Sequence, residues 1–114
     1  MSRAAVSSQI KKGSAELAVL AVLAEDALHG YEIAKRIRAE TGGVVSFDVA
    51  ALYPILYSLE SRGLVQAAWE QGPNGRRRRA YRLTVEGRRH LQPLRREWRD
   101  FFRALNRLAR FSDA

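Results

Sequence analysis

The feature that most constrains the fold is a turn signal between two segments of alternating polarity. Residues 64–70 and 79–84 alternate apolar and polar side chains, as half-buried strands do. Asn74-Gly75 lies between them, and this dipeptide is the strongest short-range signal for a β-hairpin. The sequence therefore predicts one two-stranded hairpin. Its tip is basic and carries Arg76, Arg77, Arg78 and Arg79.

Three helices are expected before this hairpin. Residues 14–25 are apolar nearly all round, which is typical of a helix buried on most sides, with Ser14 as its cap. After a connector at 25–30, residues 31–41 predict a second helix that ends at Gly42-Gly43. Residues 44–47 fit either a short strand or a linker. Asp48 is the expected N-cap of a third helix, which runs to about Arg62.

The third helix has two contrasting faces. One face is apolar and is expected to be core: Leu52, Ile55, Leu56 and Leu59. The opposite face is uncharged, whereas a merely solvated face normally carries Lys and Glu. It holds Ala50, Pro54, Tyr57, Ser58 and Ser61, with Tyr53 on its flank. Because an interior proline removes a helix hydrogen bond, Pro54 predicts either a kink or a regular helix that begins near Tyr53.

A long last helix is predicted from residue 85 to residue 114, with Thr84 as its cap. Its apolar residues are spaced alternately by three and four, which forms a heptad seam. They are Leu91, Leu94, Trp98, Phe101, Leu105 and Leu108. The seam packs against a partner helix, against the chain's own first helix, or against both. Pro93 either kinks or restarts this helix.

Composition excludes several classes of function. The chain has 114 residues, a length typical of one domain, and no cysteine, so disulfides and thiol catalysis are excluded. Two histidines make a histidine-rich metal site improbable, and we expect no cofactor. We find no P-loop, dinucleotide fingerprint or nucleophile elbow, so no enzyme is predicted. His29 is expected in a turn, with a structural or phosphate-contacting role rather than that of a base. Lacking a signal peptide and an apolar run long enough to span a membrane, the chain is expected to be cytoplasmic.

The charge points to a polyanion. The net charge is +8, and all of it falls in residues 58–114, where fourteen basic residues face six acidic ones. Three helices and a basic hairpin occur in the order of a winged helix, whose third helix fits the DNA major groove while the hairpin lies along the backbone. The candidate DNA-binding residues are Tyr31, Ala51, Tyr53, Pro54, Tyr57, Ser58, Ser61, Arg76, Arg77, Arg78 and Arg79. The alternatives are a solvated arginine loop and tyrosines that pack within the domain.

Three segments resemble the PadR family of transcriptional regulators. They are residues 28–34 (LHGYEIA), residues 52–65 (LYPILYSLESRGLV) and residues 78–87 (RRAYRLTVEG), in the family's order and spacing. The resemblance spans about residues 13–91 and implies a small member with one C-terminal helix. We therefore expect a mainly α chain with a small β-hairpin. Its parts are a flexible tail (1–13), a winged helix-turn-helix DNA-binding domain (14–84) and a C-terminal dimerisation helix (85–114).

The resemblance also implies a function. Such proteins are homodimers that usually repress genes, and two copies predict a pseudo-palindromic operator on double-stranded DNA. Some small members bind flat hydrophobic molecules between their C-terminal helices, and Trp98 falls where these carry a tryptophan. Trp98 and Phe102 therefore either stack an aromatic effector or fill the dimer core. The alternative function is a winged-helix module that contacts protein or RNA.

Overall fold

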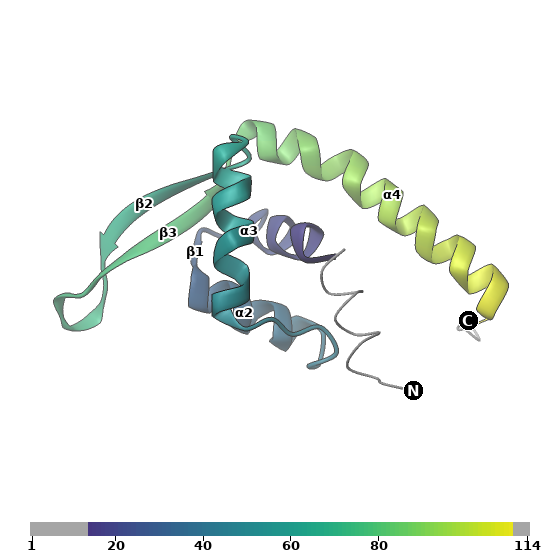
Figure 1. The fold of residues 1–114 in the computed structure, drawn as a ribbon, viewed down its shortest axis with the longest axis horizontal. Helices are drawn as coiled ribbons and strands as arrows, with labels where there is room; N and C mark the ends of the chain where they lie inside the picture. Colours follow the sequence, from purple (N-terminus) through teal and green to yellow (C-terminus); the bar gives the residue numbers. More distant parts are fainter. Residues whose placement is uncertain (1–13, 111–114) are drawn as a thin grey trace.

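In the computed structural model, the described residues are 14–110, and they form helices and a small antiparallel sheet whose hairpin extends to one side of the helices (Figure 1). Residues 14–23 are helical. The elements that follow are β1 (Leu28–His29), α2 (Gly30–Glu40), α3 (Val49–Ser61), β2 (Val65–Gln71), a 3-10 turn (Pro73–Gly75), β3 (Arg77–Leu83) and α4 (Val85–Ala109). This order confirms the predicted mainly α fold with a hairpin. We call the β2–β3 hairpin the wing. The tail expected at 1–13 lies outside the described residues.

The sheet has three strands, in the order β1-β3-β2, where only two were expected. The prediction that residues 25–30 form a connector, with His29 in a turn, is therefore wrong in part. Leu28 pairs with Tyr81 and His29 with Ala80, so β1 extends the wing by one short antiparallel strand. A two-residue strand has no alternation of its own. Its pairing depends on residues about fifty positions later in the chain, which no local pattern reveals.

The predicted hairpin turn is confirmed at Asn74-Gly75. Both residues have positive φ, 64° and 74°, which asparagine and glycine tolerate better than other residues. The last pair of the ladder is Gln71 with Arg77, so the connecting loop is residues 72–76. Gly72 N donates to the Arg76 carbonyl at 2.6 Å and closes this loop. The tip is thus a compact turn that carries the arginine run away from the core.

The core lies between the helices and the base of the wing. It contains the predicted α3 residues Leu52, Leu56 and Leu59, and Ile55 packs against its edge. Residues 44–47 form no strand, which resolves the open alternative there in favour of a linker. α3 begins at Val49, so it does not begin near Tyr53, and Pro54 lies within it. Asp48 is the N-cap residue, although its side chain makes no capping hydrogen bond.

A polar cluster ties the first helix to two later elements. Glu16 accepts a hydrogen bond from Arg62, just beyond α3, at 2.5 Å and lies 3.2 Å from His90 Nε2 on α4. Burial opposes ionisation of Glu16, but hydrogen bonds from Arg62 and His90 outweigh it and lower the pKa of this carboxyl below its ordinary value of 4.5. The ionised carboxylate therefore stabilises the junction of three helical segments.

α4 begins with a close backbone approach and then leaves the domain. Thr84 caps it as predicted, because its hydroxyl accepts from Gly87 N at 3.0 Å. A Cβ on Gly87 would lie 2.1 Å from the Leu64 carbonyl, so only glycine fits at this crossing. Leu91 is the last fully buried residue of α4. The helix continues through Pro93 without a restart, and its second half projects from the body (Figure 1).

Candidate nucleic-acid interface

A cleft of about 380 Å³ lies between α3, the start of α2 and the wing. We call it the helix–wing cleft. Tyrosine and arginine side chains dominate its walls, and six of the predicted DNA-binding residues line it. These six are Tyr31, Tyr53, Tyr57, Arg77, Arg78 and Arg79. The fold thus brings residues from three separate segments of the sequence to one site. The other five predicted residues do not line the cleft: Ala51, Pro54, Ser58, Ser61 and Arg76.

The outer face of α3 is exposed to solvent. Its predicted members Ala50, Pro54, Tyr57, Ser58 and Ser61 are all exposed, as are the candidate residues Ala51 and Tyr53 beside them. The rings of Tyr53 and Tyr57 stack with centroids 6.0 Å apart. This face offers hydroxyl groups and small apolar side chains, which suit base edges and thymine methyl groups. Its chemistry is therefore that of a helix that reads the major groove.

Tyr53 also has a structural role. A Cβ placed on Gly30 would lie 3.0 Å from the Tyr53 hydroxyl oxygen and 3.1–3.2 Å from two of its ring carbons, so this ring packs against the first residue of α2. Tyr57 is more exposed and stacks on Tyr53 from the following turn of α3. The sequence left open whether these tyrosines contact DNA or pack within the domain. The ring of Tyr53 is partly packed within the domain, against Gly30. Tyr57 is the freer of the two.

The four arginines of the wing divide into two groups. Arg76, Arg77 and Arg78 are exposed and form no ion pair with any residue in 14–110. Arg79 is different, because its guanidinium donates to Glu60 Oε2 on α3 at 2.8 Å and is only partly exposed. Three cations are therefore available to a phosphate backbone. The fourth braces the wing against α3.

His29 provides a second brace on the other face of the sheet. Its Nδ1 contacts Glu32 on α2, and its Nε2 lies 2.5 Å from Glu70 Oε1 on β2. The strand register places His29 beside Ala80, and Ala80 beside Ala68. The side chains of His29 and Glu70 therefore meet over two small alanine side chains. The backbone N–H of His29 also donates to Glu32 at 2.9 Å, and this bond lowers the pKa of that carboxyl. The predicted structural role of His29 is consistent with these contacts.

Sequence reasoning missed Trp69. It lies on β2 opposite Arg79, lines the helix–wing cleft and is 58% exposed. The guanidinium carbon of Arg77 is 5.2 Å from the centre of its ring, and that of Arg79 is 5.7 Å. The sequence signal that could have revealed it is an aromatic residue near the end of the first hairpin strand. The hairpin pairs this position with the arginine run on the second strand. Strand alternation alone assigned it no role.

The predicted seam on α4 is largely uncovered within one protomer. Leu91 is buried and Leu94 packs at the edge of the core. Beyond them Trp98 and Leu105 are half-buried, Phe101 is exposed, and Leu108 is 82% exposed. Trp98 makes an edge-to-face contact with Phe101 at 5.9 Å between centroids. An apolar face of this length on a projecting helix is typical of a surface that another helix covers.

Phe102 faces a different surface from the seam. It lines an apolar groove of about 380 Å³ with residues of the first helix and of α2, among them Leu17, Ala21 and Ile37. Trp98 does not line this groove, although its ring lies 5.7 Å from that of Phe102. The two predicted effector residues are therefore in contact, but only Phe102 lines this groove.

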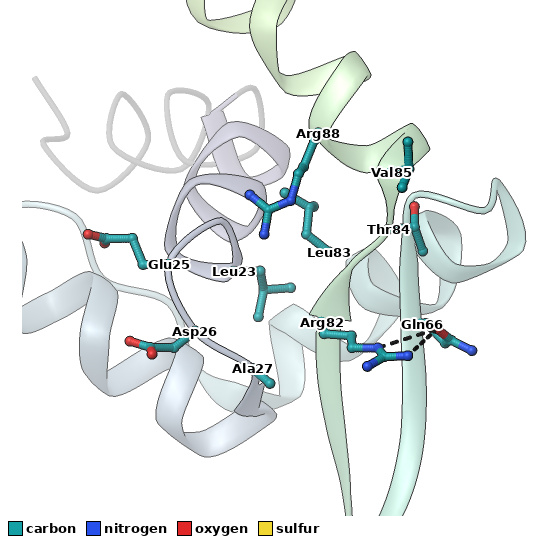
Figure 2. Close-up of a pocket in the computed structure, with 10 residues that line it drawn as sticks. All are labelled: Leu23, Glu25, Asp26, Ala27, Gln66, Arg82, Leu83, Thr84, Val85 and Arg88. Atoms are coloured by element: carbon teal, nitrogen blue, oxygen red, sulfur yellow. Dashed lines mark hydrogen bonds between the residues drawn. The ribbon is translucent and has the colours of Figure 1, made fainter.

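A separate recess of about 500 Å³ lies at the base of the wing (Figure 2). Its two arginines already have partners, because Arg82 donates to the Gln66 side chain at 3.1 Å and Arg88 donates to the Ala24 carbonyl at 3.3 Å. Glu25 and Asp26 also line it, and Asp26 accepts a hydrogen bond from Arg36 at 3.1 Å. None of the predicted site residues lines it. We therefore assign this recess no part in the nucleic-acid interface.

Comparison with known proteins places this geometry in a family. The model of the transcriptional regulator PadR-like family matches residues 19–93. A protein of Lysinibacillus sphaericus, named only as uncharacterized protein X, is 30% identical over 93 residues, which are 82% of this chain and 85% of that protein. No described helix is both long and apolar enough to cross a membrane.

Solved structures agree with this match. A PadR family transcriptional regulator from Eggerthella lenta has a TM-score of 0.79 at 28% identity, over 96% of this chain and 93% of that one. A transcriptional regulator from Clostridium thermocellum has a TM-score of 0.78 at 28% identity, over 87% and 96%. PadR of Bacillus subtilis, solved in complex with operator DNA, has a TM-score of 0.64 at 25% identity, over 69% of this chain and 44% of that one.

Proposed function

Because this chain belongs to the PadR-like family of transcriptional regulators, which are DNA-binding proteins and not enzymes, we propose that it is a homodimeric repressor of a pseudo-palindromic operator. The observation that carries this proposal is the uncharged outer face of α3 beside three unpaired wing arginines. The relative from Bacillus subtilis binds operator DNA, which supports the same role here. A cytoplasmic location follows from this role, because the partner is chromosomal DNA.

The two structural parts have separate tasks in this proposal. Residues 14–84 bind DNA, with Ala51, Tyr57 and Ser58 on the reading face of α3. Arg76, Arg77 and Arg78 contact phosphates, which supplies affinity without sequence information. Residues 85–114 join two protomers through the α4 seam. Two reading helices then lie about one helical turn of DNA apart, on the order of 34–36 Å.

A ligand releases the repressor in this proposal. The exposed aromatic rings of α4 are the candidate site, because two copies of Trp98 and Phe102 brought together by the seam form an aromatic surface. A flat apolar molecule fits there by stacking. Binding between the two α4 helices changes the spacing of the reading helices and so weakens operator binding.

A selection from random duplex DNA tests the proposal. The protein is incubated with a duplex library at about 150 mM salt, the physiological range, and bound sequences are enriched over several rounds. The proposal predicts two inverted half-sites separated by about one turn of the duplex. Enrichment without two-fold symmetry contradicts the homodimeric operator, and preferential capture of structured RNA in a parallel library favours the alternative partner.

A further inference from the structure

Trp69 is a large apolar side chain that the fold does not need for its core. The neighbouring strand residue Tyr81 is fully buried, whereas Trp69 is 58% exposed. It lies near the outer end of the wing, where the ladder joins only β2 and β3. Tryptophan is enriched among the residues that contribute most to binding energy at interfaces, so this exposed ring is a candidate contact.

Two guanidinium groups hold the Trp69 ring in place. Arg79 pairs with Glu60 and is fixed against α3, and its guanidinium carbon lies 5.7 Å from the ring centre. Arg77 lies at 5.2 Å and has no carboxylate partner among the described residues. Cation–π attraction keeps the ring and the Arg77 guanidinium together without neutralising the cation. The pair therefore presents a flat apolar surface beside an available positive charge.

The two faces of the wing differ in charge. Alternation along the strands places Trp69, Arg77 and Arg79 on one face, with Tyr81 further along β3. Glu70 is on the other face, where it contacts His29 and is paired in the ladder with Arg78. An anionic strand therefore meets the arginine face without approaching the carboxylate of Glu70. Trp69, Arg77 and Arg79 of this face line the helix–wing cleft together with Tyr57 of α3, and the cleft is also lined by His29, Glu32 and Arg78.

From this arrangement we propose that Trp69 is a DNA-contacting residue and that the helix–wing cleft holds the sugar–phosphate backbone of one DNA strand. The indole ring packs on a deoxyribose, and Arg77 donates to the adjacent phosphate. This inference rests on the proposed DNA-binding function and adds a residue and a surface to it. Because the contact is with the backbone, it is independent of base sequence.

Tryptophan fluorescence tests the inference directly. The chain has two tryptophans, so the difference between the wild-type protein and Trp69→Phe reports Trp69, and the remaining signal reports Trp98. The probe is a mixed-sequence duplex of about 30 base pairs at about 50 mM salt, where phosphate contacts dominate binding. Anisotropy of a labelled copy of the same duplex reports binding independently.

At saturating DNA we expect the Trp69 emission to fall by about half and its quenching by acrylamide to decrease. The Trp98 signal stays unchanged. Trp69→Ala weakens binding of the duplex about tenfold with an unchanged melting temperature, and Trp69→Phe recovers most of the affinity, because an aromatic ring in the same position still packs on the sugar.

Two results overturn the inference and are distinguishable. If anisotropy shows that DNA binds while the emission and acrylamide quenching of Trp69 do not change, the ring lies outside the interface, and the proposed function stands. If anisotropy shows no binding of the duplex to the wild-type protein, the inference and the proposed function fail together.

Discussion

Arg79 on β3 donates a hydrogen bond of 2.8 Å to Glu60 Oε2 on α3, so one ion pair joins the wing to the helix that carries the candidate reading face. Both side chains are about one-third exposed. The pair is therefore partly shielded from water. It therefore helps to hold the wing against α3.

Glu60→Ala removes this brace and leaves the Arg79 guanidinium without its carboxylate. We expect the free energy of unfolding to fall by about 1 kcal/mol, as for a partly buried pair. The affinity for DNA should fall about fivefold, which corresponds to about 1 kcal/mol. Urea denaturation and anisotropy measure the two effects. Glu97→Ala, at an exposed position of α4, is the matched control and should change neither by more than about 0.5 kcal/mol.

Replacing Arg76, Arg77 and Arg78 together with alanine removes the three unpaired cations of the wing. We expect weaker binding to every duplex and a salt dependence that is shallower by up to about three units of log–log slope, one for each lost phosphate contact. Anisotropy titrations at several salt concentrations give this slope. The triple replacement of Arg96, Arg103 and Arg107 removes the same charge from the side of α4 opposite the seam. Equal slopes for the two triple variants would show that the wing tip stays off the DNA.

Tyr57→Ala separates sequence preference from general affinity. Tyr57 is exposed on the outer face of α3, and its removal should lower the ratio of specific to non-specific affinity about tenfold, as one lost base contact does. Tyr53→Ala should in addition lower the melting temperature, because Tyr53 packs on Gly30. An unchanged ratio in both variants would mean that α3 reads no base through these positions.

Leu105→Glu places a charge in the middle of the α4 seam. We expect the dimer to dissociate, since a carboxylate cannot be buried there without a partner. Light scattering at several protein concentrations measures the mass. Arg107→Glu, on the opposite face of α4, should leave the dimer intact. A folded Leu105→Glu protein that still has the mass of a dimer would remove the seam from the interface.

Acid should weaken the junction at Glu16. Its pKa is lowered in the folded protein, so the ionised form contributes stability that is present above about pH 4.5 and is lost as the pH falls through the folded pKa. The contribution should be below about 1 kcal/mol, because the group is partly exposed. Glu16→Gln should lose it at neutral pH and show a flatter stability curve below pH 4.5. Urea denaturation at fixed protein concentration measures the free energy of unfolding of the wild-type protein and of Glu16→Gln at each pH. If the two curves of stability against pH run parallel, they contradict this assignment.

Local patterns predicted the elements whose signals are local. Periodicity placed the helices and the Leu52, Leu56 and Leu59 core of α3, and the Asn74-Gly75 dipeptide placed the hairpin turn. Three features depend on contacts between distant segments and were not predictable in this way. They are the pairing of β1 with β3, the ion pair of Arg79 with Glu60, and the exposed position of Trp69 between two guanidiniums. The sequence showed the arginine run. Only the fold shows that three of the arginines have no ion-pair partner among the described residues, whereas Arg79 pairs with Glu60 on α3.

The most direct test of the central claim is an anisotropy titration with the chain's own upstream promoter and a scrambled duplex of equal length, at about 150 mM salt. Sequence-specific recognition predicts a preference for the promoter of tenfold or more, which corresponds to about 1.4 kcal/mol. Tyr57→Ala should reduce this preference while the scrambled duplex binds as before. Equal affinity of the wild-type protein for the promoter, for the scrambled duplex and for every duplex recovered by selection would contradict the account of α3 as a reading helix.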